Sequence, residues 1–144
     1  MNTFHILLQG IRKRPGLYLG NKSLSRLAHF RHGYELRERI EYWEKQTGLS
    51  FSEHFYEAVN FTMPASESFL MRLLFDEFVH AHYGQTMGAM CAETLIVTMS
   101  NSEDEAFDKY CELYDEFCAL EGITIPILPD APPIKVIDVS SKNV

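Results

Sequence analysis

Apolar residues recur at helical spacing over the first fifty residues of the chain. The first group stands at i, i+3, i+4 and i+7, the pattern of a short amphipathic helix, and consists of Phe4, Leu7, Leu8 and Ile11. This helix should end at Arg14, because the residue before a proline disfavours the helical conformation. A second helix follows a cap at Asn21 or Ser23 and runs to Gly48, a residue that suits a helix C-terminus. Its apolar positions are Leu24, Leu27, Tyr34, Leu36, Ile40 and Trp43.

The segment "RPGLYLGN" (14–21) separates these two helices. Pro15 and Gly16 predict a tight turn that joins the helices. Leu17, Tyr18 and Leu19 should then close the end of the hydrophobic core.

The middle of the chain contains one strongly apolar segment. Residues 55–59 fit either a helix or a loop, and Pro64 with Ser66 predicts the start of the next helix. Residues 68–83, "SFLMRLLFDEFVHAHY", are apolar around most of a helical circumference, so this helix should lie in the middle of a bundle. The polar positions form one narrow strip that is expected to face water, and they are Arg72, Asp76, His80 and Tyr83.

The clearest helical pattern of the chain lies at residues 102–122 and follows a less certain segment. Residues 85–99 fit a helix through Met87, Met90, Cys91 and Leu95, although "LIVTM" also suits a buried strand. Ser102 and Glu105 then form a capping-box pattern for a helix that closes at Gly122. Its expected packing face consists of Phe107, Tyr110, Leu113, Tyr114 and Phe117.

This succession of helices predicts an all-α fold. We expect a compact helical bundle of about five to six helices over residues 1–122. Residues 123–144 hold four prolines among alternating β-branched residues, which predicts an extended proline-rich C-terminal tail packed on the same domain.

Composition supports a single globular domain. The chain has 144 residues, of which 46% are apolar, and its apolar runs are shorter than the roughly 18 residues of a membrane helix. The positive charge at the N-terminus follows the apolar stretch, unlike in a signal peptide. Three cysteines without metal-ligand spacing predict buried thiols in a reducing compartment. We therefore expect a soluble, cytoplasmic protein that has no membrane partner.

The charge is unevenly distributed along the chain. Residues 1–50 hold nine Lys and Arg against four Glu, a net charge of +5. Residues 51–144 hold four Lys and Arg against sixteen Asp and Glu, a net charge of −12. The acidic part should repel nucleic acid and attract basic proteins.

The first candidate for chemistry is the basic loop near the N-terminus. "RKRPGLYLG" (12–20) resembles a segment of the ATPase domain of the DNA gyrase B subunit over about ten residues. The E-x-x-x-N, D-x-G-x-G and glycine-rich lid elements of that family do not occur here. Because a phosphate cradle requires closely spaced glycines, we interpret this loop as a hinge and expect no nucleotide cofactor.

The second candidate is a metal or catalytic site formed by histidines and acidic residues. Glu77 and His80 form one E-x-x-H, but a carboxylate-bridged metal pair requires a second copy on another helix. His80 and His82 point about 200° apart on a helix, so we expect His80 to pair with Asp76 and His82 to be partly buried. Glu77 falls between apolar positions and should have either a hydrogen-bonding partner in the core or a raised pKa. His29 and His32 share a face and remain a possible pair of metal ligands. No Ser-His-Asp order or C-x-x-C motif supports catalysis, so we expect no enzyme and no metal.

The third candidate is the polar face of the last helix. Residues 101–122 hold eight Asp and Glu against Lys109 alone, with like charges at i, i+3 and i, i+4. Such spacing destabilises a helix, which indicates that a basic partner selects it. The residues that we expect to bind this partner are Glu105, Asp108, Glu112, Asp115 and Glu116.

Several short motifs are similar to a family of small bacterial immunity proteins from toxin–immunity pairs, including contact-dependent growth inhibition. The motifs are R-P-x-x-Y-L-G (14–20), S-L-x-x-L (23–27), F-x-x-G-Y (30–34), an Asp-Glu pair before Ala-Phe (104–107) and L-x-D-E-F (113–117). The similarity spans about residues 4–118, is poor between 48 and 80, and does not include the tail.

The resemblance implies a protein that binds the C-terminal domain of a cognate toxin and blocks its active site. Many such toxins are nucleases with basic clefts, so the acidic face would imitate nucleic-acid phosphate. The basic N-terminal half would face the toxin instead if the toxin surface were acidic. A small nucleotide- or metal-dependent enzyme and a helical adaptor are the alternatives.

Overall fold

The computed structural model describes residues 3–62, 67–88, 90–125 and 128. Its regular secondary structure within these ranges is helical, as predicted. The helices are α1 (Thr3–Lys13), α2 (Pro15–Leu19), α3 (Leu24–Thr47), α4 (Phe55–Val59), α5 (Glu67–His82), α6 (Ala92–Thr98) and α7 (Glu103–Leu120). The described part therefore has seven helices where about five to six were expected, because residues 15–19, expected as a turn, form the separate short helix α2. Most of the predicted tail, and the predicted helix start at Pro64 and Ser66, lie outside the described residues.

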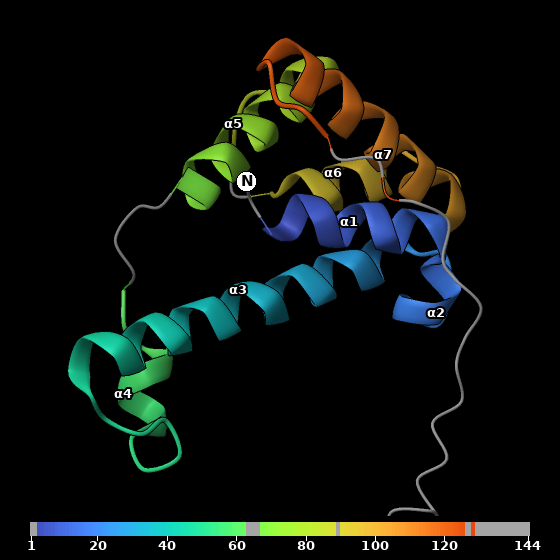
Figure 1. Ribbon diagram of the computed structural model, residues 1–144. Helices are drawn as coiled ribbons and strands as arrows, with labels where there is room; N and C mark the ends of the chain where they lie inside the picture. The colour runs from blue at the N-terminus through green and yellow to red at the C-terminus, as the bar shows by residue number, and fades with distance from the viewer. Residues whose placement is uncertain (1–2, 63–66, 89, 126–127, 129–144) are drawn as a thin grey trace, which may run out of the picture.

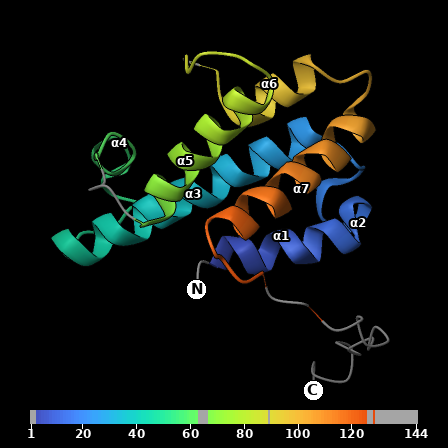
Figure 2. The ribbon, with the colours of Figure 1, turned by 90° about the horizontal axis from the view of Figure 1, so that it is seen from above.

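The long helix α3 extends beyond the rest of the bundle. Figures 1 and 2 show α1, α6 and α7 along its N-terminal part and α5 over its middle, while its C-terminal part projects away and ends beside α4. Trp43 and Ala58 are buried where α3 meets α4, outside the main cluster of buried residues. The structure thus has one main core and a smaller one at the far end of α3.

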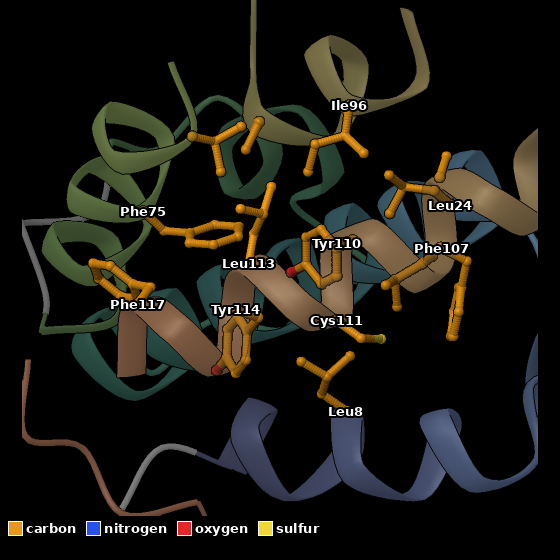
Figure 3. Close-up of a cluster of buried hydrophobic side chains, with 14 of the residues drawn as sticks. Leu8, Leu24, Phe75, Ile96, Phe107, Tyr110, Cys111, Leu113, Tyr114 and Phe117 are labelled. Atoms are coloured by element: carbon orange, nitrogen blue, oxygen red, sulfur yellow. The ribbon is translucent and has the colours of Figure 1, made fainter. Parts of the chain in front are cut away.

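The main core is built around α7 (Figure 3). Five helices contribute the following buried side chains to it: Leu8 and Ile11 from α1, Leu24 and Leu27 from α3, Phe75 and Val79 from α5, Ile96 from α6, and Phe107, Tyr110, Leu113, Tyr114 and Phe117 from α7. The ring of Phe75 meets Tyr110, Tyr114 and Phe117 edge-on, with centroids 5.4, 5.6 and 5.4 Å away. The predicted packing face of the last helix is confirmed.

Capping contacts account for the helix boundaries. The Ser23 hydroxyl accepts a hydrogen bond from the Arg26 amide, so Ser23, and not Asn21, is the cap of α3. Ser102 accepts from the Glu105 amide in the same way. The Glu105 carboxylate, however, reaches the Asn101 amide at 3.4 Å and not that of Ser102, so the capping box forms in only one direction. Gly48 follows α3 with φ 69°, a left-handed conformation that glycine adopts without steric cost.

Two uncertain segments and one turn are resolved. Residues 55–59 are helical, and residues 92–98 are helical and not a strand. The expected tight turn at Pro15 and Gly16 is wrong, because Pro15 occupies the first turn of helix α2, where its missing N–H costs nothing. Leu19 is buried at the core, but Leu17 and Tyr18 are 65% and 52% exposed and do not close it.

The predicted orientation of α5 is wrong. Asp76 and His80, expected to face water, are buried, whereas Phe69, Leu70, Leu73 and Leu74 are 41–52% exposed. Glu77 and His82 are also exposed, contrary to their expected burial. Polar side chains turn inward here because each one finds a hydrogen-bonding partner inside the bundle.

The partners of the inward strip are specific. The Asp76 carboxylate accepts a hydrogen bond of 2.9 Å from the Ala92 amide, at the first residue of α6. His80 Nδ1 lies 2.7 Å from the Asp76 main-chain oxygen, which can only accept, so Nδ1 carries the proton. Arg72 Nη1 is 2.8 Å from Glu35 on α3. The strip thereby connects α5 to both α6 and α3.

Replacing Asp76 tests the inward orientation of α5. Asp76→Ala should lower the free energy of unfolding by about 2–3 kcal/mol, because the buried Ala92 amide would lose its acceptor. Urea unfolding followed by circular dichroism measures this difference. Asp76→Asn, which keeps an acceptor oxygen, should lower the free energy of unfolding by less than Asp76→Ala does. Glu77→Ala, at the exposed neighbouring position, should change it by no more than about 0.5 kcal/mol. Equal losses for Asp76→Ala and Glu77→Ala would contradict the orientation.

Candidate functional site

The five acids expected to bind a partner all lie on α7, outside its packing face. Glu105, Asp108, Glu112 and Glu116 are exposed, and Asp115 is half-buried. At about 100° per residue, Glu105, Glu112 and Glu116 lie within about 40° of one another on the helix circumference. Asp108 and Asp115 lie on one flank, about 60–80° from Glu105.

The two flanking aspartates have partners within the chain. Arg12 on α1 holds Asp115 through two hydrogen bonds of 2.6 and 2.8 Å, and these bonds raise the pKa of Arg12. Lys22, in the loop before α3, lies 2.8 Å from Asp108 and 3.5 Å from Asp104, and its pKa is also raised, chiefly by the hydrogen bond to Asp108. Basic residues of the N-terminal half thus neutralise part of the acidic helix.

The remaining three acids form what we call the acidic stripe: Glu105, Glu112 and Glu116. Glu112 has one local ion pair, with Lys109 at 3.4 Å. The Glu105 carboxylate accepts a hydrogen bond from the Asn101 amide. Glu116 makes no ion pair with the described residues. Exposed pairs such as Lys109–Glu112 are weak, so the stripe keeps most of its negative potential.

Glu103, at the start of α7, has a structural role that the sequence did not indicate. Its carboxylate accepts hydrogen bonds from the Ser23 hydroxyl at 3.1 Å, the Ser25 amide at 2.9 Å and the Ser25 hydroxyl. These bonds, those from Ser25 first, lower the pKa of Glu103. The start of α7 is therefore fixed to the start of α3.

A buried ion pair joins α3 to α6. Arg31 Nη1 and Nη2 lie 2.6 and 3.0 Å from the two carboxylate oxygens of Glu93, and both side chains are almost fully buried. Neither residue was identified from the sequence. The four-residue spacing of Arg31 and Glu35 was the available signal, but nothing in the sequence links residue 31 to residue 93.

Other reactive residue types include thiols and a tyrosine buried in the core and an exposed pair of histidines on α3. Burial raises the pKa of the Cys111 and Cys118 thiols to about 11, so both remain protonated at neutral pH, as expected of buried thiols. Cys91 is only half-buried, so the prediction is wrong for this third cysteine. Tyr114 hydrogen-bonds to His5, and burial raises the pKa of Tyr114. The rings of His29 and His32 lie 6.5 Å apart. Within the described residues, no group of three His, Cys, Asp or Glu side chains could hold a metal ion.

Comparisons of the chain with models of known protein families, with curated proteins and with solved structures find no match. Among the described helices, none has both the length and the apolar character required to cross a lipid bilayer.

The role of Glu103 predicts a pH-dependent change in stability. Glu103→Gln should lower the free energy of unfolding at pH 7 by about 1–2 kcal/mol, since it removes charge-assisted hydrogen bonds. The folded-state pKa lies below the ordinary value of 4.5, so the wild-type advantage is complete above pH 4.5 and disappears as the pH falls through the folded-state pKa. Urea unfolding at a series of pH values from 7 to 3 measures this difference.

Glu116→Gln is the matched control for Glu103→Gln, because it removes the same charge from an exposed site on the same helix. It should change stability by no more than about 0.5 kcal/mol at neutral pH. A Glu103→Gln deficit that persists unchanged at pH 3 would show that the carboxylate charge is not what stabilises the contact.

Proposed function

We propose that this chain is a cytoplasmic immunity protein that binds the C-terminal domain of a cognate bacterial toxin, of the contact-dependent growth inhibition type, and neutralises it by occluding its active site. The toxin domain would be a basic nuclease. The observation that carries this proposal is the acidic stripe on α7, together with the sequence motifs that resemble immunity proteins.

The placement of the stripe supports binding through charge. Glu105, Glu112 and Glu116 occupy one line on a helix whose opposite face is buried in the main core. Carboxylates held on such a helix need little rearrangement before they meet a basic surface, which reduces the entropy lost on binding. Complementary charge also raises the rate of association.

Inhibition of this kind requires no reacting group on the immunity protein. A nuclease cleft binds phosphates through Lys and Arg, and a row of carboxylates can occupy the same cations. The protein would then prevent access of nucleic acid without binding nucleic acid itself. Flanking residues Asp108 and Asp115 would contribute less than the stripe, since both are already paired.

The test is a salt-dependent binding measurement with the C-terminal domain of the protein encoded immediately upstream. We expect nanomolar binding that weakens as ionic strength rises and that abolishes the nuclease activity of the partner. Glu112→Gln with Glu116→Gln should weaken binding about tenfold or more, because two desolvated charge pairs would be lost.

Glu53→Gln with Glu57→Gln is the matched control, because it removes two exposed carboxylates near α4, away from the stripe. The affinity of this control variant for the toxin domain should stay within about twofold of the wild-type value. No complex with the upstream product, or equal weakening by both double variants, would refute the proposal that the stripe is the binding surface.

A further inference from the structure

A pocket of about 60 Å³ lies where α1, α3, α5 and α7 meet. Most of its wall is aromatic, and the rings of Phe4 and Tyr34 stand 6.0 Å apart on one side of it. Figure 3 shows Phe75, Tyr114 and Phe117, which belong to the same wall, as neighbours in the core. The pocket also contains four charged residues, which are Arg31, Glu35, Glu38 and Arg72.

The charges around the pocket do not balance. Arg31 is paired with Glu93 at 2.6 Å, and Arg72 with Glu35 at 2.8 Å. Glu38, three residues after Glu35 on α3, is half-buried and makes no ion pair with any described residue. Burial, with Glu35 and Glu41 nearby, raises the pKa of Glu38. Among the described residues, the Glu38 carboxylate at this aromatic pocket thus has no counter-ion.

This arrangement restricts the chemistry of an occupant. An anion would be repelled by Glu38, while the charges of Arg31 and Arg72 are already paired with Glu93 and Glu35. Arg31 Nε, a buried donor without an acceptor among the described residues, offers an anion only a single N–H. A purely apolar group would bury Glu38 further without compensation, which is unfavourable. A cation carried on an apolar stem would neutralise Glu38 while its stem and charge contact aromatic rings.

We propose that the pocket receives the guanidinium group of an arginine side chain that a partner protein presents. The source of this arginine rests on the proposed function, because a basic toxin domain supplies such side chains. A planar guanidinium stacks on aromatic faces and pairs with a carboxylate through two N–H groups, which an ammonium does not. A volume of 60 Å³ holds about four to six water-sized atoms, which accommodates the four heavy atoms of a guanidinium.

The experiment uses the full chain and two small probes, followed by NMR chemical shifts. N-acetyl-arginine methylamide should produce saturable shifts at Tyr34, Glu38, Met71 and Phe75, with a dissociation constant on the order of millimolar for a single side chain. N-acetyl-citrulline methylamide has nearly the same shape but no charge, and should bind at least about fivefold more weakly. Equal shifts with both probes, or no saturable shift with arginine, would overturn the proposal.

Two variants locate the binding carboxylate. Glu38→Gln should reduce the arginine affinity at least about fivefold, while Glu53→Gln, which removes an exposed carboxylate before α4, should leave it within about twofold. Unchanged binding by Glu38→Gln, or shifts confined to α7, would also overturn the proposal. The comparison of arginine with citrulline requires no variant, so it decides the question even if Glu38→Gln fails to fold.

The two proposals can fail separately, because the probe experiment requires no toxin. Arginine recognition without a complex with the upstream product would refute the immunity function and leave the pocket chemistry in place. If the protein forms a salt-sensitive complex with the upstream product but does not bind the arginine probe, only the proposal of arginine recognition by the pocket is refuted.

Discussion

Burial of one face of α7 is the constraint on which the rest of the structure depends. Ala106, Phe107, Tyr110, Leu113 and Phe117 are each 3% exposed or less. Complete burial of one large apolar side chain contributes about 1.5–3 kcal/mol, so this single face contributes a free energy comparable to the net stability of a typical domain. Since α3, α5 and α6 all contact α7, the buried face of α7 determines where these helices pack. The opposite face of α7 is therefore exposed to solvent.

Polar contacts then specify how the short helix α6 is placed. Its first residue, Ala92, gives its amide to Asp76 of α5, and its second, Glu93, meets Arg31 of α3. A buried ion pair contributes little net stability, because desolvation offsets most of the attraction, but loss of one partner leaves an uncompensated charge. Any shift of α3 along α6 would create that situation. The pair therefore makes alternative packings unfavourable more than it stabilises the observed one.

The sequence predicted the elements of this fold better than it predicted their orientation. The packing face of α7 was predicted correctly, because its apolar positions follow one stripe and its polar positions the opposite one. The same reasoning was wrong for α5, where it assumed that polar residues face water. Asp76 and His80 turn inward because an amide of α6 and a main-chain oxygen satisfy them, and no periodicity within α5 carries that information. Glu93 was missed for the same reason, since its partner is 62 residues away.

The candidate site was also only partly accessible from the sequence, since its charge depends on contacts between distant segments. The basic N-terminal half and the acidic remainder suggested two surfaces of opposite sign. In the folded chain, Arg12 and Lys22 pair with Asp115 and Asp108, so part of the asymmetry is cancelled internally. The stripe of Glu105, Glu112 and Glu116 extends about 16 Å along α7 at 1.5 Å per residue. Arg12 and Lys22 are held by the aspartates and do not screen this line directly, so Lys109, 3.4 Å from Glu112, is the cation that the described structure places against the stripe.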